Sequence, residues 1–369
     1  MLVFVGTYTE PILFGTGKVL EGKGEGIYVF GLDTESGALE AVGKTTGVAN
    51  PSYLAFHPSR RFLYAVNELK TYEGAPTGAV SAFAVDPATG SLRLLNRRPT
   101  HGTDPCHVVV DDAGKHVFVA NFMSGSVCVL PVGAGGSLGE ASDFVAHQGS
   151  GIDPARQKGP HAHSVPLDAS SRHAFVPDLG LDKLLVYRFD PGRGMLEPHP
   201  TPWVKVKPGA GPRHLALHPG GRFAYLVNEL DSTVVALAYD RRAATFEYLQ
   251  SVSTLPDGFE GASTCADIHV SPSGDFVYAS NRGHDSIAIF RQDPHAGTLR
   301  CVGHESAGGR TPRSFGIDPS GRFLLAANQD GDSIVVFRID AGSGMLRPTG
   351  HVAPVPTPVC VKFLVRSRG

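Results

Sequence analysis

Arginine, histidine and glutamate residues that could act on a small polar molecule occur in short segments along the chain. A carboxylate or an imidazole can take a proton from water, and an arginine can stabilise an oxyanion or bind a carboxylate or phosphate. We expect the catalytic residues to be His161, His163, Arg213, Glu229 and Arg282. Which of the two histidines is catalytic stays open. This combination predicts acid–base chemistry on an anionic substrate.

A second group of residues is expected to bind that substrate. Arg313 occupies the position in a sequence repeat that Arg213 occupies in an earlier copy, and its planar guanidinium could hold a phosphate or a second carboxylate with two hydrogen bonds. The other expected substrate-binding residues are Asp178, Asp267, His269 and Gln329. Buried arginines have a desolvation cost that a bound anion would offset.

A metal site is the main alternative use of the same residues. Two imidazoles separated by one residue, as in His161 and His163, share one face of a strand and could begin a metal site. The side chains that could complete it are Asp178, Glu229, Asp267 and His269. Arginines at the same place would repel a divalent cation. We therefore predict no metal and no cofactor.

The elements that must position these residues come from an internal repeat. Each copy begins with an apolar run, continues through a turn, and ends its second run at a residue such as Asn228. The copies start at Pro51, Pro105, Pro160, Pro212, Ala266, Pro312 and Pro358, which are 46 to 55 residues apart. The short runs of Val, Ile, Phe and Tyr in each copy predict antiparallel strands. Seven such units predict an all-β, seven-bladed β-propeller with four-stranded antiparallel blades, as a single domain over residues 1–369.

The two ends of the chain are expected to share one blade. Only one apolar run, residues 359–365, follows the last repeat start, whereas residues 2–7 and 26–33 match the second and third runs of the other copies. A blade assembled from both termini removes the open edges of the sheet. We therefore predict a closed ring of blades.

The repeat also predicts where the ionisable residues meet. Side chains alternate along a strand, so the first and third residues after each repeat start share a face, which in a propeller lines the central channel. In the middle copies these residues are His161, His163, Arg213, Asp267, His269 and Arg313. The residue after the strand-ending Asn is Glu229, Arg282 or Gln329 in three of the copies. We expect all of them at one mouth of the channel.

Composition narrows the class of protein. With 45 Gly and 28 Pro among 369 residues the chain is poorly suited to helices, and with 41% hydrophobic residues it is unlike a disordered chain. Its 33 Lys and Arg against 35 Asp and Glu give a net charge of −2, which predicts no binding to nucleic acid or to a membrane. The five cysteines lack CxxC spacing, and no signal peptide or long apolar run is present. We expect a cytoplasmic monomer that binds a small-molecule substrate.

Several segments together resemble a known family. They are Val5-Gly-Thr-Tyr-Thr9, Pro160-His-Ala-His163, Pro177-Asp-Leu-Gly-Leu-Asp182, Gly211-Pro-Arg-His214, Asn228-Glu-Leu230, Ala266-Asp-Ile-His269 and Ser280-Asn-Arg-Gly-His-Asp-Ser286. This combination, over nearly the whole chain, is similar to the seven-bladed lactonase family, which groups propeller-type 6-phosphogluconolactonases with fungal carboxy-cis,cis-muconate cyclases. The resemblance implies a cofactor-free site. In the cyclase branch the catalytic residues match one of the two histidines, Arg213, Glu229 and Arg282.

These observations predict a lactonase that hydrolyses a small anionic or sugar lactone, similar to a 6-phosphogluconolactonase. Ionised Glu229 would assist the attack of water, with His161 or His163 as its partner. A muconate-type cyclisation, in which a carboxylate adds across a double bond, could use the same residues, and the sequence does not distinguish the two directions. A non-enzymatic propeller that docks proteins is the alternative of another class. It would not need an Arg, Glu and His cluster, and the chain has one Trp and no WD-repeat signature.

Overall fold

The structure, a computed structural model, describes residues 1–365, in which the regular secondary structure consists of β-strands. The chain forms two compact units. Unit 1 contains residues 1–5, 29–42 and the chain from residue 213 onward, and unit 2 contains residues 6–28 and 43–212. Within the described residues, no helix has the length and apolar character that crossing a bilayer requires.

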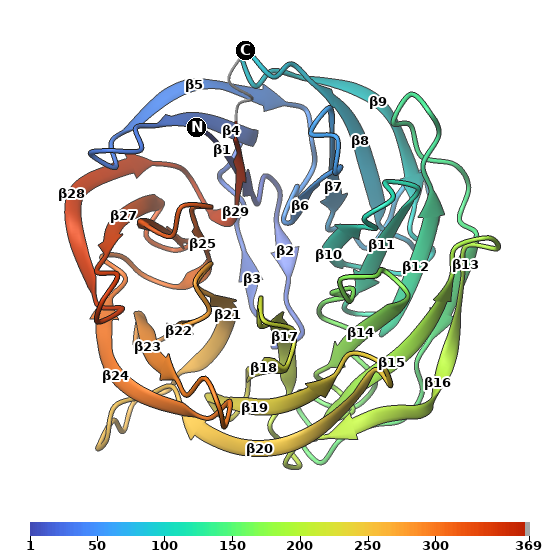
Figure 1. Ribbon diagram of the computed structural model, residues 1–369. Helices are drawn as coiled ribbons and strands as arrows, with labels where there is room; N and C mark the ends of the chain where they lie inside the picture. The colour runs from blue at the N-terminus through green and yellow to red at the C-terminus, as the bar shows by residue number, and fades with distance from the viewer. Residues whose placement is uncertain (366–369) are drawn as a thin grey trace. The chain divides into compact units, whose positions relative to one another are not determined.

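Four sheets of four strands each contribute to unit 1 (Figure 1). Three of them follow the chain in order: β17 (Pro212–Leu217), β18 (Phe223–Asn228), β19 (Thr233–Asp240) and β20 (Thr245–Ser253); β21 (Thr264–Val270), β22 (Phe276–Arg282), β23 (Ser286–Gln292) and β24 (Leu299–Ser306); β25 (Pro312–Ile317), β26 (Phe323–Asn328), β27 (Ser333–Ile339) and β28 (Leu346–Pro354). The fourth has the order β29 (Pro358–Leu364), β1 (Leu2–Thr7), β4 (Gly26–Leu32) and β5 (Leu39–Thr46).

Unit 2 contains two four-stranded sheets, one three-stranded sheet and a short hairpin. These are β6 (Leu54–Phe56), β7 (Phe62–Asn67), β8 (Ala79–Val85) and β9 (Leu92–Pro99); β10 (Pro105–Val110), β11 (His116–Asn121), β12 (Ser126–Pro131) and β13 (Asp143–Ala146); β14 (His173–Asp178), β15 (Lys183–Asp190) and β16 (Met195–Lys205); and the hairpin of β2 (Ile12–Leu13) and β3 (Val19–Leu20).

The prediction of a seven-bladed β-propeller is confirmed, with one correction to the blades. Six sheets have four strands, but the blade that begins at Pro160 has three. Its first segment runs beside β14 through isolated bridges, Ala162 with Asp178 and Leu167 with Ala174. Pro160 and Pro166 carry no N–H, so this segment cannot form a continuous ladder. The His161–His163 segment therefore lies on irregular backbone.

Neighbouring blades are joined by a contact that repeats with the sequence. In unit 1 the hydroxyl of Tyr225 donates to the carbonyl of Gly297 over 3.1 Å, and that of Tyr278 donates to the carbonyl of Gly344 over 2.8 Å. In unit 2 the hydroxyl of Tyr64 makes the same bond to a glycine carbonyl. Each glycine has a positive φ, which lets the turn of one blade approach the next closely. The repeating Tyr and Gly positions thus bring consecutive blades into contact.

The apolar core of unit 1 lies between consecutive sheets. Val277 and Ala279 of β22 pack with Tyr225 of β18 in one cluster, whereas Tyr278 of the same strand packs with Phe315 of β25 in another. Alternate side chains of β22 therefore fill the two opposite interfaces of its sheet. This double burial explains why β22 begins with a continuous apolar run, residues 276–279.

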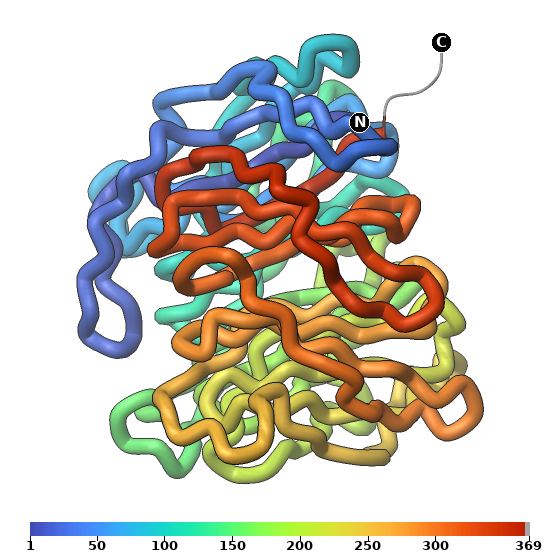
Figure 2. The backbone as a smooth tube through the Cα atoms, turned by 90° about the vertical axis from the view of Figure 1, so that its left-hand side faces the viewer, coloured from blue at the N-terminus to red at the C-terminus, as the bar shows by residue number. Residues whose placement is uncertain are grey.

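Both ends of the chain contribute to one blade, as the sequence predicted. β29 and β1 are neighbours in the same sheet, and Figure 2 shows the N-terminus beside the C-terminal strand. The N–H of Leu32 donates to the carbonyl of Met1 over 2.8 Å, which holds β1 against β4. Within unit 1 this blade contacts the preceding one through an exposed ion pair between Glu35 and Arg322, at 3.2 Å. The terminal strands thus complete a sheet that would otherwise be open.

Candidate active site

Glu229 is the centre of an ion-pair cluster in unit 1. It follows β18 directly, at the position that the repeat predicted, and is 5% exposed. Its Oε2 accepts a hydrogen bond from Nε of Arg213 over 3.1 Å and lies 2.9 Å from Nη2 of Arg282. Charge-assisted bonds of this kind are about twice as strong as neutral ones. Two guanidinium groups thus hold one carboxylate oxygen.

Arg213 is held on several sides. Its Nη1 donates to the carbonyl of Ala266 and lies 3.2 Å from Nε2 of His214. Burial, together with the positive charges of Arg282 and Arg313, lowers the pKa of Arg213 to about 10. A pKa of about 10 still leaves the guanidinium charged at neutral pH. The three arginines therefore concentrate positive charge in one small region of the cluster.

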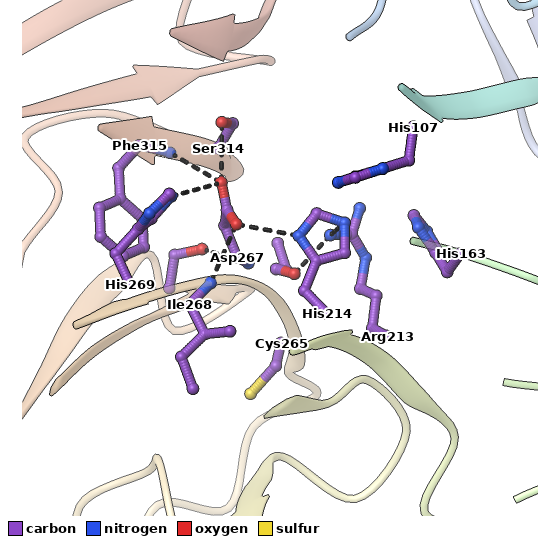
Figure 3. A network of polar contacts seen from close by, with 12 residues as sticks. His107, His163, Arg213, His214, Cys265, Asp267, Ile268, His269, Ser314 and Phe315 are labelled. Atoms are coloured by element: carbon purple, nitrogen blue, oxygen red, sulfur yellow. Dashed lines mark hydrogen bonds and ion pairs between the residues drawn. The ribbon is translucent and has the colours of Figure 1, made fainter. Parts of the chain in front are cut away.

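Asp267 connects three neighbouring strands of unit 1 (Figure 3). Its Oδ1 accepts from Nδ1 of His214 over 2.9 Å, and its Oδ2 accepts from the hydroxyl of Ser314 over 2.9 Å. Nε2 of His269 lies 3.4 Å from the same Oδ2. Burial alone would raise the pKa of Asp267, but the charge of His269 and the hydrogen bonds from both imidazoles hold it well below its usual value. Asp267 is therefore ionised.

Extra residues in the first strands direct some of these side chains. In β21, Ala266 and Asp267 stand opposite the single residue Ser280 of β22, because the pairing shifts between Cys265 and Ile268. In β25 the shift falls between Pro312 and Ser314, which makes Arg313 the extra residue. Such β-bulges bend a strand and redirect a side chain, and they are common next to active sites. The repeat position predicted to carry chemistry is thus a bulge position in these two blades.

The remaining expected residues of unit 1 are Arg282, Gln329 and Arg313. Arg282 ends β22 and donates from Nη2 to the carbonyl of Cys265 over 2.7 Å. Gln329 follows β26, is 4% exposed, and donates from its amide to the side chain of Asp330 over 2.8 Å. Arg313 is half-buried, and its charge acts on Arg213. The structure therefore brings Arg213, Glu229 and Arg282 into direct contact and places Arg313 close enough to affect them.

The two expected histidines of unit 2 lie around one aromatic ring. The ring of His161 stacks on Phe122 with centroids 4.7 Å apart, and the ring of His163 meets the same phenyl ring edge-on at 5.1 Å. Nδ1 of His161 contacts the carbonyl of Phe122 over 3.0 Å. Nδ1 of His163 lies 3.6 Å from the thiol of Cys106. The two histidines thus have different surroundings: His161 is half-buried and His163 is 5% exposed.

Asp178 holds the histidine segment in place. It is fully buried, and its Oδ1 accepts from the backbone N–H of His161 over 2.7 Å and from that of Gly180 over 3.0 Å. Its Oδ2 lies 2.6 Å from Nδ1 of His147. These contacts fix the backbone of a segment that lacks a regular ladder.

The residues 1–365 contain no group of three or more His, Cys, Asp or Glu side chains placed to hold a metal ion. The five cysteines are free thiols, and all but Cys301 are buried.

His214 is a site residue that was not predicted from the sequence. Strict alternation along β17 puts His214 on the face opposite Arg213, yet the long side chain of Arg213 reaches its neighbour's ring. The sequence did contain a signal for His214, because His214 and Asp267 both lie just after the start of a repeat copy. Spacing alone could not show that Asp267 and His214 contact each other across two strands.

The sequence of the whole propeller matches one protein family. The sequence profile of the family described as Lactonase, 7-bladed β-propeller, matches residues 2–363. The chain belongs to this family, a class of lactone-hydrolysing enzymes.

Two bacterial 6-phosphogluconolactonases are similar to this protein along most of the chain. The 6-phosphogluconolactonase of Bacillus subtilis is 39% identical over 98% of this chain and 97% of its own length. The 6-phosphogluconolactonase of Formosa agariphila is 35% identical over 85% of each chain. Among solved structures, the periplasmic gluconolactonase of Pseudomonas aeruginosa is 35% identical and superposes with a TM-score of 0.90 over 100% of both chains.

Proposed function

We propose that this lactonase hydrolyses an anionic sugar lactone, with 6-phosphogluconolactone as the substrate to test first. The observation that carries the proposal is the buried cluster in which Arg213 and Arg282 share Oε2 of Glu229. The names of the relatives in Bacillus subtilis and Formosa agariphila support the phosphorylated substrate.

The excess of positive charge supports an anionic ligand. Arg213, Arg282 and Arg313 carry three positive charges, and Glu229 supplies one negative charge among them. Asp267 supplies another, but its hydrogen bonds to His214 and Ser314 direct it to other partners. Guanidinium groups bind phosphate and carboxylate through paired N–H bonds. A phosphate would therefore offset the desolvation cost of the arginines.

The proposed reaction is addition of water followed by ring opening. The water oxygen forms a bond to the lactone carbonyl carbon, and the carbonyl π electrons move onto oxygen as an oxyanion. Glu229 accepts the proton of the attacking water, and the arginines donate hydrogen bonds to the oxyanion. The oxyanion then collapses, the bond between the carbonyl carbon and the ring oxygen breaks, and the leaving oxygen takes up that proton. The product is the open-chain acid, which releases its own proton at neutral pH.

We assign different roles to the two buried aspartates that were expected to bind substrate. Asp178 and Asp267 both have their carboxylates hydrogen-bonded to histidines and to the chain around them. We infer that they hold site residues in place. His269, Gln329 and Arg313 stay proposed substrate-binding residues.

Several expectations stay predictions. These are His161 or His163 as the partner of Glu229, the absence of a cofactor, the monomeric state, and a cytoplasmic location. On location the relatives point to no single answer, because the Pseudomonas aeruginosa neighbour is named as a periplasmic protein.

The test is steady-state hydrolysis of 6-phosphogluconolactone beside glucono-1,5-lactone, with the spontaneous rate subtracted. The proposal predicts a kcat/KM at least about ten times higher for the phosphorylated lactone, since one charge-assisted hydrogen bond is worth about 1.5–3 kcal/mol. Equal values would contradict the anionic substrate. Turnover of a muconate to its lactone, with no lactone hydrolysis, would favour the cyclase alternative.

A further inference from the structure

His214 lies between a carboxylate and the guanidinium of the active-site cluster (Figure 3). On one side its Nδ1 is 2.9 Å from Oδ1 of Asp267, and on the other its Nε2 is 3.2 Å from Nη1 of Arg213. All three side chains are less than 10% exposed. The three residues therefore form a chain of polar contacts that leads to Glu229 through Arg213.

The partners on both sides fix the position of the imidazole proton. An ionised carboxylate can only accept, so the proton of a neutral His214 lies on Nδ1 and points to Asp267. Burial, together with the positive charge of Arg213, lowers the pKa of His214 to about 4, so the ring is neutral at pH 7. Nε2 then presents a lone pair to the N–H of Arg213. The opposite tautomer would direct two N–H groups at each other.

Asp267 is itself fixed by neighbouring strands. The hydroxyl of Ser314 in β25 donates to Oδ2 over 2.9 Å, and the backbone N–H of Ile268 donates to Oδ1 over 3.0 Å. The N–H of Asp267 in turn donates to the hydroxyl of Ser280 in β22 over 3.0 Å. Contacts with residues of β21, β22 and β25 therefore fix the orientation of the Asp267 carboxylate that His214 faces.

Arg213 has contacts through both Nη1 and Nε. Nη1 is shared between His214 and the carbonyl of Ala266, while Nε donates to Glu229. Without the acceptor on His214, Nη1 loses one of its acceptors, so the guanidinium plane could rotate slightly and still keep its charge. Such a rotation would misdirect the N–H groups that an oxyanion needs, and a misplacement of about 1 Å can cost about 10²-fold in rate.

We propose that Asp267 and His214 are positioning residues that set the orientation of the Arg213 guanidinium for the chemical step. This inference rests on the proposed lactonase function of the same cluster. It assigns His214 and Asp267 no contact with the substrate. Because a misplacement of about 1 Å can cost about 10²-fold in rate, we expect a change of either residue to lower activity by about 10- to 100-fold.

Two substitutions of His214 separate positioning from simple packing. The amide oxygen of His214→Gln can take the place of Nε2 and accept from Arg213, whereas the shorter amide of His214→Asn can replace Nδ1 and donate to Asp267 only. We expect His214→Gln to keep kcat within about 5-fold and His214→Asn to lower it about 10- to 100-fold, with KM nearly unchanged in both. His218, a turn histidine that follows the same strand, supplies matched controls, and His218→Gln and His218→Asn should both keep kcat.

The comparison includes the thermal midpoint of each variant. Equal kcat losses in His214→Gln and His214→Asn, in proportion to lost stability, would overturn the proposal, as would a rise in KM with kcat unchanged. If neither His214 variant folds, the near-isosteric Asp267→Asn serves instead, because an amide N–H facing Nδ1 favours the wrong tautomer. A folded Asp267→Asn with full kcat would overturn the proposal, and a 10-fold or larger loss of kcat would support it. A wild-type protein that hydrolyses no lactone would instead refute the proposed function.

Discussion

Nε of Arg213 donates a hydrogen bond to Oε2 of Glu229 over 3.1 Å, and both side chains are almost completely enclosed by the protein. Arg282 contacts the same oxygen at 2.9 Å. Because the three residues share one carboxylate oxygen, removing any of them changes the surroundings of the other two. Effects of substitutions in this cluster should therefore be strongly non-additive.

Arg313 should affect binding of a charged substrate more than the chemical step. Arg313→Met removes one guanidinium, and we expect KM for 6-phosphogluconolactone to rise about 10-fold or more with little change in kcat, since a hydrogen bond to a charged group is worth about 1.5–3 kcal/mol. Steady-state kinetics measure both constants. The matched control is Arg310→Met, because Arg310 is exposed and nearby in sequence. A collapse of kcat at constant KM would instead place Arg313 in the transition state.

Acid should destabilise the protein through His214. Its pKa is lowered from 6.5 to about 4, so between these values the unfolded chain binds a proton that the folded protein excludes. The stability that this group contributes is therefore present above pH 6.5 and is lost as the pH falls toward 4, by on the order of 2 kcal/mol at pH 4.5. The low pKa of Asp267 acts in the same direction below its usual value of 3.8.

Denaturant unfolding of the wild type and His214→Gln at pH 7.5 and 4.5 measures this effect. The difference in unfolding free energy between the two proteins should shrink at pH 4.5, because only the wild type loses the contribution of a neutral buried imidazole. A difference that stays constant with pH would show that His214 titrates normally in the folded protein.

Gly297 should be essential for packing between blades. It has a φ of +72°, and a Cβ there would lie 2.2 Å from Cδ1 of Phe223. Gly297→Ala should lower the unfolding free energy by about 1–2 kcal/mol for the left-handed backbone and by about 1–3 kcal/mol more for overpacking. Gly258→Ala is the matched control, because its φ of +78° is similar and a Cβ there meets nothing within 4 Å. Equal losses of stability in the two variants would contradict the packing argument.

The fold could be predicted from the sequence because the pattern of apolar runs and turns repeats about once per blade. The seven repeat starts gave the blades, and the unmatched runs at the two ends gave the shared sheet of β29 and β1. The missing first strand of the Pro160 blade was not predicted, since strand propensity does not reveal where two prolines interrupt a ladder. The single-domain assignment over residues 1–369 stays a prediction.

The candidate site could be predicted only in part. The repeat phase identified Arg213 and Glu229, which the structure brings into contact. It could not identify His214, because alternation assumes regular strands and short side chains. It placed Asp267 among the site residues, but it could not show that the partners of this carboxylate are two imidazoles and a serine hydroxyl.

The central role in the proposed reaction is that of Glu229, which takes the proton of water. The decisive measurement is kcat for hydrolysis of 6-phosphogluconolactone by Glu229→Gln, together with the dissociation constant of the product acid. We expect kcat to fall by about 10²-fold or more while product binding changes by less than about 5-fold, because Gln keeps the size of the side chain and an acceptor oxygen but cannot take the proton. A Glu229→Gln variant that retains full kcat would contradict this role.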